Sequence, residues 1–151
     1  MSRIAALLAC LLLAGCAASA TGVGSASPTT DNRAIVADFA RLFYTERNVP
    51  EAFERYVAED YIQHNPGIAN GRAAAVAALA PMFSEPGRKF EIRQILVDGE
   101  MAVIHVHAIP EPGSRGASVF DMYRLSKGKI VEHWDAIQPV PAQSANPHPM
   151  F

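Results

Sequence analysis

The stretch ASVFDMYRLSKGKIVEHWDAI, residues 117–137, decides the fold because it contains two β-rich runs separated by a glycine turn. Apolar and polar side chains alternate along both runs, as in strands that rest one face on a core. Gly128 suits the left-handed position of a three-residue turn, Ser126-Lys127-Gly128. The stretch therefore predicts an antiparallel hairpin in which Leu125 pairs with Lys129.

The second half of the chain predicts a four-stranded antiparallel meander that ends in this hairpin. Its β-rich runs cover residues 89–97, 101–109, 117–125 and 129–137. Glycine-containing turns separate them, at Asp98-Gly99, in the longer loop from Pro110 to Gly116, and in the hairpin.

The first half of the chain has helical periodicity instead. Apolar residues recur at helical spacing from Asp31, a residue type suited to an N-cap, to about Asn48. Pro50 suits the start of a short second helix, and an alanine-rich third helix is expected at about 72–83. The stretch 61–67 between them predicts a loop edge. Helices followed by strands predict an α+β fold with one pocket between the two layers.

The hairpin register groups three titratable side chains on one face of the sheet. Asp121 would lie opposite His133, and Val119 opposite Asp135, so that both acids and the imidazole project together while Trp134 projects from the other face. Two carboxylates beside an imidazole form an arrangement suited to general acid–base catalysis near pH 7. A two-residue turn would break this grouping, and the alternative is a solvated cluster of weakly interacting charges.

His105 and His107 lie two residues apart on one predicted strand and therefore share a face, which either lines a cavity or meets water. The spacing does not say which of the two would face Asp121. Zinc requires three or four well-placed ligands, and the spacing of the histidines supplies no third one. We therefore expect no metal site.

Three further positions are candidate ligand contacts with structural alternatives. Tyr61 and Trp134 are either aromatic platforms for a ligand or contacts of the core or a dimer. His64-Asn65 precedes Pro66 and either faces the pocket or makes ordinary turn contacts.

The N-terminal residues predict an export signal rather than part of a domain. Residues 1–15 carry one cation, Arg3, and then an apolar run that is too short to span a membrane. The ending Leu13-Ala14-Gly15-Cys16 resembles the lipobox of bacterial lipoproteins, which implies that Cys16 becomes a lipidated N-terminus. The alternative is an ordinary secretory signal. Residues 16–30 predict a flexible tether, followed by one domain at 31–151.

Lipidation would place the protein in the cell envelope. Ala17 after the cysteine resembles the outer-membrane sorting pattern of two-membrane bacteria, with the domain facing the periplasm. The two cysteines, Cys10 and Cys16, would leave no free thiol in the mature domain, which excludes disulfides, thiol catalysis and cysteine-ligated metals. A formal net charge of −2 gives no electrostatic basis for binding nucleic acid.

With these residues described, the sequence resembles the SnoaL-like polyketide cyclases, especially their predicted aldol-condensation branch, within the nuclear transport factor 2-like superfamily. The resemblance covers nearly all of the mature domain. It rests on five segments: residues 60–66, Gly71-Arg72, residues 120–124, residues 128–135 and the Met150-Phe151 ending. It implies a cone made of a curved mixed sheet and three N-terminal helices, a pocket without metal or organic cofactor, and a homodimer formed through the outer sheet face.

The resemblance also implies roles for individual residues. Asp121 would transfer the proton, His133 with Asp135 would tune it, and His64 together with His105 or His107 would hold an enolate oxygen. Two functions are then expected. One is a cofactor-free lyase or isomerase that removes a proton beside a carbonyl group. The other is a non-catalytic envelope protein that binds a small apolar molecule or a partner. A purely structural lipoprotein is a third, less suited to so many clustered titratable groups.

Overall fold

The computed structural model describes residues 28–151, and the surroundings of side chains from Asp31 onward. The export signal, Cys16 and most of the tether therefore lie outside the described residues. The first helix begins at Pro28, a residue type favoured in the first turn, and so starts three residues before the expected N-cap. In this described part of the chain, no helix is both long and apolar enough to cross a membrane.

Helices fill the first half of the described chain and strands the second half, as expected. The elements in chain order are α1 (Pro28–Ala40), the π-helical turn η1 (Arg41–Thr45), α2 (Val49–Tyr56), β1 (Val57–Gln63), α3 (Arg72–Ser84), β2 (Lys89–Asp98), β3 (Met101–Ile109), β4 (Ala117–Ser126) and β5 (Lys129–Pro139). Asn48 caps α2, because its side chain accepts a hydrogen bond from the backbone N–H of Glu51.

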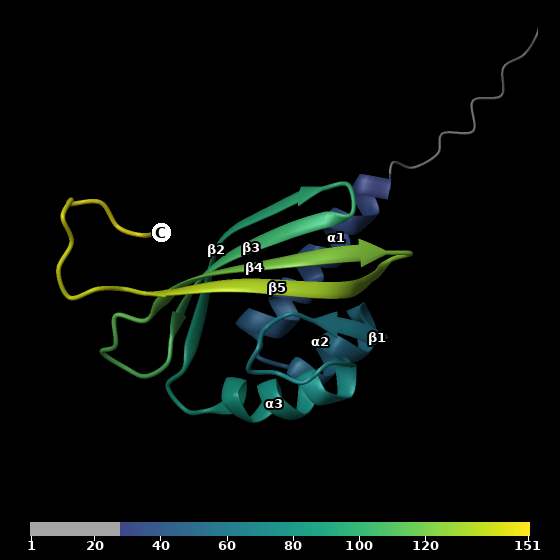
Figure 1. Ribbon diagram of the computed structural model, residues 1–151, viewed down its shortest axis with the longest axis horizontal. Coiled ribbons are helices and arrows are strands. Elements are labelled where there is room, and N and C mark those ends of the chain that lie inside the picture. The colour runs from purple at the N-terminus through teal and green to yellow at the C-terminus, as the bar shows by residue number, and fades with distance from the viewer. Residues whose placement is uncertain (1–27) are drawn as a thin grey trace, which may run out of the picture.

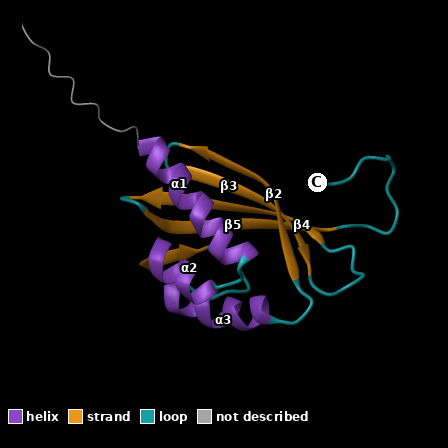
Figure 2. Cartoon of the chain, turned by 180° about the vertical axis from the view of Figure 1, so that it is seen from behind, coloured by secondary structure: helices purple, strands orange, loops and turns teal. Residues whose placement is uncertain are grey.

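The five strands form one mixed sheet in the order β1-β5-β4-β3-β2. The sheet curves around the helices, which all lie on its concave side (Figures 1 and 2). This is the α+β cone with a curved mixed sheet and three N-terminal helices that the sequence and its resemblance predicted, and the cone is open at one end.

The strand β1 is a correction, because Tyr61–Gln63 were expected in a loop edge. This segment instead pairs in parallel with β5, with Val57 beside Ile130 and Gln63 beside His133. Val57 and Tyr61 are buried. The pairing extends the antiparallel meander to a mixed sheet and brings the residues after β1 beside β5, where the backbone N–H of His64 donates to the carbonyl oxygen of His133 at 3.0 Å.

The turn between β4 and β5 also differs from the expected one. Ser126 pairs with Lys129, so only Lys127 and Gly128 form the turn, and both have positive φ angles (49° and 77°). A bulge follows, since Leu125 pairs with Ile130 but Arg124 pairs with Glu132. The predicted pairing of Leu125 with Lys129 is therefore wrong.

The same bulge restores the predicted grouping of side chains. Asp121 lies opposite Asp135 and Tyr123 lies opposite His133, so the expected Asp121–His133 and Val119–Asp135 cross-strand pairs are wrong by two residues. Because strand faces alternate with a period of two, a shift of two residues leaves the same side chains on the same face. Asp121, His133 and Asp135 thus still project together.

Aromatic side chains dominate the core between the sheet and the helices. Phe39 is fully buried and contacts the rings of Phe43, Phe53 and Tyr123 at centroid distances of 5.2, 6.1 and 5.3 Å. Phe83 of α3 stacks on Phe43 at 4.4 Å. These contacts hold the helices against the inner face of the sheet and form one wall of the cavity described next.

Candidate functional site

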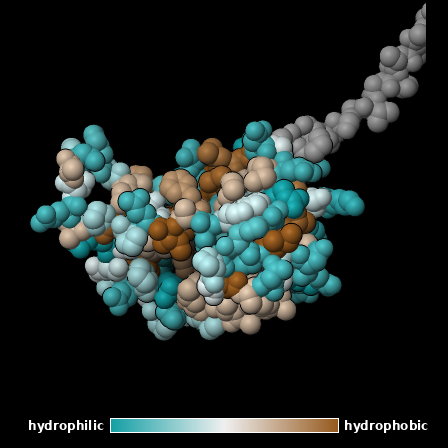
Figure 3. Space-filling view, viewed as in Figure 1, coloured by the Kyte–Doolittle hydropathy of each residue, from teal (hydrophilic) through white to brown (hydrophobic). Residues whose placement is uncertain are grey.

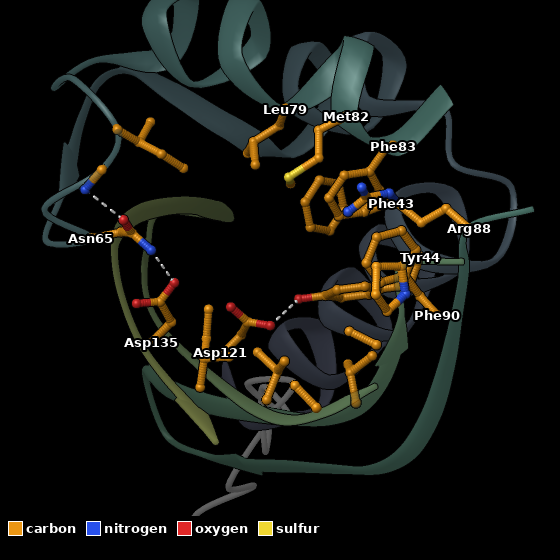
Figure 4. A pocket seen from close by; sticks show the side chains of 18 of the residues that line it. Phe43, Tyr44, Asn65, Leu79, Met82, Phe83, Arg88, Phe90, Asp121 and Asp135 are labelled. Atoms are coloured by element: carbon orange, nitrogen blue, oxygen red, sulfur yellow. Dashed lines mark hydrogen bonds between the residues drawn. The ribbon is translucent and has the colours of Figure 1, made fainter. Parts of the chain in front are cut away.

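A cavity of about 550 Å³ lies between the concave face of the sheet and the helices. Its volume is within the range of small-molecule sites. Most of its lining is apolar, from α3 on one side and from β3 and β4 on the other; Arg88 lies on one side, and most of the other polar groups gather near Asp121 (Figure 4). The site is therefore an apolar chamber with a local polar cluster.

The π-helical turn η1 brings a tyrosine to this cluster. Leu42, Phe43 and Tyr44 are all buried, and the wider turn lets consecutive side chains face the interior. The Tyr44 hydroxyl donates a hydrogen bond of 2.7 Å to Oδ2 of Asp121 and lies 2.8 Å from the Tyr123 hydroxyl. Since Tyr44 donates to the carboxylate, Tyr123 donates to Tyr44.

Asp121 is also joined to His133, which pairs through Nε2 with Oδ1 of Asp121 at 2.8 Å. Asp121 and His133 are only 8% and 6% exposed. A charged pair at this depth costs desolvation free energy, which its hydrogen bonds must offset. Both carboxylate oxygens of Asp121 therefore have defined partners at the surface of the cavity.

The position of the proton on His133 follows from Gln63. Nδ1 of His133 lies 2.8 Å from Oε1 of Gln63, and the same oxygen accepts a hydrogen bond of 2.9 Å from the backbone N–H of Asn65. Because Oε1 is an acceptor, Nδ1 of His133 must carry a proton. The remaining nitrogen, Nε2, then shares a single proton with Asp121, either as imidazolium with carboxylate or as neutral imidazole with carboxylic acid.

Two further polar groups of the cluster come from the β1 end. The side-chain amide of Asn65 donates to Oδ2 of Asp135 at 2.5 Å. The hydroxyl of Tyr61 accepts a hydrogen bond of 3.1 Å from Nε2 of Gln63, which leaves its own proton available for donation. Tyr61, Asn65 and Asp135 all line the cavity.

The three tyrosines of the site stay protonated at neutral pH. Burial raises the pKa of Tyr44, Tyr61 and Tyr123, and the negative charge of Asp121 raises each of these pKa values further. Their hydroxyl groups are therefore hydrogen-bond donors over the whole physiological range.

Asp121, His133 and Asp135 also offer ligand atoms that all lie within 4.8 Å of one another. A divalent cation could bind there with three protein ligands. Such an ion would have to replace the hydrogen bond between Asp121 and His133. In the structure, these two side chains share a proton instead.

The structure does not bring every expected residue to the cavity. His105 and His107 lie on the outer face of β3, because Ile104 and Val106 occupy the inner face. Nε2 of His105 pairs with the Ser118 hydroxyl at 2.8 Å. The expectation that one of these histidines faces Asp121 is corrected, since they lie on the opposite side of the sheet from it.

His64 and Trp134 are outer-face residues as well. Their rings stack at 4.8 Å, and Nε2 of His64 lies 2.8 Å from Oε1 of Glu132. The predicted outward projection of Trp134 agrees with this placement, whereas neither residue lines the cavity as a ligand contact would. Of the expected set, Tyr61, Asn65, Asp121, His133 and Asp135 line it together.

Sequence reasoning missed Tyr44, Tyr123 and Gln63 as members of the site. Tyr44 is 77 residues from Asp121 in the chain, so no local pattern could link them. A signal did exist for Tyr123, because it is two residues from Asp121 and therefore on the same strand face. The apolar set Ile104 and Val106 likewise identified the inner face of β3.

Comparison with protein families finds one match, to the family described as SnoaL-like domain, over residues 28–133. No curated protein matches the chain. The matched residues include all of β4, which carries Asp121, and the first part of β5 up to His133.

Solved structures with the same fold include a nuclear transport factor 2-like protein of unknown function from Mesorhizobium loti, with 22% identity and a TM-score of 0.63 over 73% of this chain and 93% of that one. A candidate ketosteroid isomerase from Kribbella flavida has 18% identity and a TM-score of 0.64, over 80% and 87% of the two chains. A candidate SnoaL-like polyketide cyclase from Jannaschia has 17% identity and a TM-score of 0.57, over 77% and 91%. At these identities the likeness shows the fold alone.

Proposed function

The chain belongs to the SnoaL-like domain family, and from this premise we propose that it binds a small apolar carbonyl compound and moves a proton at the carbon next to the carbonyl group. One observation carries the proposal: a buried Asp121–His133 pair, 2.8 Å apart, at the wall of an apolar cavity. An apolar chamber with a few convergent polar groups is the usual form of a small-molecule site. The candidate isomerase and cyclase among the similar folds are consistent with carbonyl chemistry.

In this proposal Asp121 is the base. The C–H bond beside the carbonyl breaks, its proton moves to a carboxylate oxygen of Asp121, and the electron pair moves to the carbonyl oxygen as an enolate. A ligand that fills the cavity displaces water from around Asp121, which strengthens every electrostatic interaction with the developing charge. His133 remains fixed by Gln63 and adjusts the charge of Asp121 through the shared proton.

The enolate oxygen requires a hydrogen-bond donor. The histidines expected in this role lie on the outer face, so another residue must supply the donor. Tyr61 supplies one, because its hydroxyl accepts from Gln63 and its own proton is available. Its pKa is raised by burial, so it donates without ionising. Asn65 is a second donor, provided that its amide turns from Asp135 to the ligand.

The test is deuterium exchange at the α-carbon of 1-tetralone in D₂O, followed by NMR. The wild type should exchange these protons faster than buffer does, and Asp121→Asn should remove at least about 99% of the enhancement because it removes the base. Binding of the ketone, read as a rise in melting temperature, should persist in the variant. Equal exchange by wild type and Asp121→Asn would exclude Asp121 as the base.

The second candidate function is binding without catalysis, and one observation favours it. Both oxygens of Asp121 already have partners, in Tyr44 and His133, so the network also suits a purely structural role in the cavity wall. In that case the ketone would raise the melting temperature of the protein without any enhanced exchange.

We propose further that the protein is a lipoprotein of the cell envelope, attached through Cys16, because Leu13-Ala14-Gly15-Cys16 resembles a lipobox. Intact-mass analysis of the membrane fraction should show loss of residues 1–15 and addition of acyl chains. Cys16→Ser should release the protein from the membrane. A wild-type protein that retains its signal would contradict this assignment.

A homodimer through the outer sheet face belongs to the same proposal. Leu96 and Phe120 are 54% and 47% exposed on that face, which is unusual for side chains of their size. Sedimentation equilibrium should give twice the chain mass, and Phe120→Asp should yield monomers.

A further inference from the structure

One cation lies in the wall of the otherwise apolar and acidic cavity. Arg88 is the only lysine or arginine among the residues that line it. It follows the Pro86-Gly87 turn and immediately precedes β2. In Figure 4 it lies beside Phe83 and Phe90, across the cavity from Asp121 and Asp135.

The guanidinium group of Arg88 is largely buried and incompletely paired. Its side chain is 18% exposed, and Nε is buried without a hydrogen-bond partner. Its only ion pair within the described chain joins Nη2 to Oε2 of Glu85 at 2.5 Å, and the Glu85 side chain is 55% exposed. A half-exposed partner contributes little, whereas a buried donor without a partner costs free energy. The charge of the guanidinium group is therefore only weakly neutralised by Glu85 and can attract a further anion.

The backbone around Arg88 is held in place by a second arginine. Nη1 of Arg47 donates to the carbonyl oxygens of Glu85 and Arg88 at 3.2 and 3.0 Å. The backbone N–H of Arg88 also donates to the carbonyl of Glu85 at 3.3 Å. The Arg88 side chain thus starts from a fixed turn. Ligand binding therefore costs little entropy for ordering the backbone of the protein.

The charges of the cavity favour one orientation of a ligand. Asp135 repels an anionic group at its end, where the Asp121–His133 pair shares one proton and is neutral overall, while Arg88 attracts it at the other. A single planar guanidinium matches the two oxygens of a carboxylate, and a phosphate dianion would leave a second charge without a cation.

We propose that the natural ligand is an apolar carbonyl compound that also bears a carboxylate, and that Arg88 binds this carboxylate in exchange for Glu85. The inference rests on the proposed function and adds the class and the orientation of the substrate. The carboxylate is held at Arg88, and the carbonyl end is directed to Asp121.

The test compares octanoate with methyl octanoate, which differ by one charge, in calorimetric titrations of the purified full chain. The wild type should bind octanoate at least about tenfold more tightly than the ester, as expected for a charge-assisted pair. Arg88→Gln should remove this preference and leave binding of the ester unchanged. Arg93→Gln, which removes a cation from the outer face, is the matched control and should change neither affinity.

A second variant tests the exchange with Glu85. Glu85→Gln removes the competing carboxylate, so octanoate should bind roughly twofold or more tightly while the ester is unaffected. This gain of affinity cannot result from misfolding. Equal binding of octanoate and its ester by the wild type, or parallel loss of both in Arg88→Gln, would overturn the role of Arg88 but not the pocket function. Absence of binding by both compounds would overturn the pocket function and this inference with it.

Discussion

The two faces of strands β3, β4 and β5 carry the same kinds of side chain and hold them differently. On the inner face, His133 has a hydrogen-bond partner at each ring nitrogen and is 6% exposed. On the outer face, the ring of His105 stacks flat on Phe120 at 4.1 Å, and Phe120 is 47% exposed. Figure 3 shows several groups of hydrophobic side chains among hydrophilic ones on this side of the molecule, one of them over β2.

The difference indicates how one sheet can carry two kinds of surface. Hydrogen bonds at both nitrogens fix the tautomer and the orientation of a ring, which proton transfer requires. His105 instead has one hydrogen bond, to the Ser118 hydroxyl, which can donate or accept and so does not fix the tautomer. The exposed ring of Phe120 beneath it presents apolar area to a partner. Chemistry is therefore expected on the inner face and association on the outer one.

The largest expected effect is the loss of inner-face packing on β3. Ile104→Ala truncates a fully buried side chain and should lower the free energy of unfolding by about 2–5 kcal/mol. Phe120→Ala, on the outer face of β4, should cost about 1 kcal/mol or less in the monomer. Urea unfolding of the two variants measures both values. Equal costs would show that the outer face is buried in the protein in solution.

The next largest effect concerns two histidines that each form a side-chain hydrogen bond, His133 on the inner face and His105 on the outer face. His133→Ala leaves Oδ1 of Asp121 without its partner in a buried site and removes one of the hydrogen bonds to Oε1 of Gln63, which should cost about 3 kcal/mol. His105→Ala removes a partly buried hydrogen bond to Ser118 and should cost about 1 kcal/mol. Thermal and urea unfolding distinguish the two. A double variant with Asp121→Asn should recover part of the loss, because it removes the unpaired charge, and further destabilisation would contradict the pairing.

The fold could be predicted from the sequence wherever the signal was local. The two-residue period of β2 to β5 and the helical period of α1 and α3 each arise within one element, so their positions were found. β1 was missed because its evidence is its pairing with β5, far along the chain, while Glu59 and Asp60 hide its short pattern. A parallel pairing of this kind leaves no mark in the local sequence.

The site was predictable only where two members share a hairpin. Asp121, His133 and Asp135 were grouped despite a wrong register, because the type of turn and the bulge together shift the pairing by two residues and preserve the face. Tyr44 contacts Asp121 from the helical layer. The contact depends on how the helices pack on the sheet, which the spacing of residues along the sequence does not show. For His105 and His107, the sequence left open whether their face lines the cavity or meets water. The apolar Ile104 and Val106 decide this, because they occupy the inner face of β3.

A smaller effect is expected at alkaline pH from the inner face. Burial raises the pKa of Tyr44, Tyr61 and Tyr123, so the folded protein keeps protons that the unfolded chain loses above about pH 10. Stability should therefore fall as the pH rises beyond that value. Absorbance of tyrosinate should remain low until the protein unfolds. Tyr44→Phe should weaken this dependence, and an unchanged titration would contradict the burial of its hydroxyl.

The smallest effect is expected at acid pH from the outer face. Burial, and then the charge of Arg93, lowers the pKa of His105 below the ordinary value of 6.5. The unfolded chain then binds a proton that the folded protein does not, so stability is lost as the pH falls from 6.5 toward the lowered pKa. Urea unfolding at about pH 8 and about pH 5 should give a smaller difference for His105→Gln than for the wild type. Arg93→Gln should reduce the difference in part, since desolvation remains, and the neighbouring His107 and Glu91 are retained in both variants. If His105→Gln keeps the full difference, another group titrates in this range and the outer face does not control stability at acid pH.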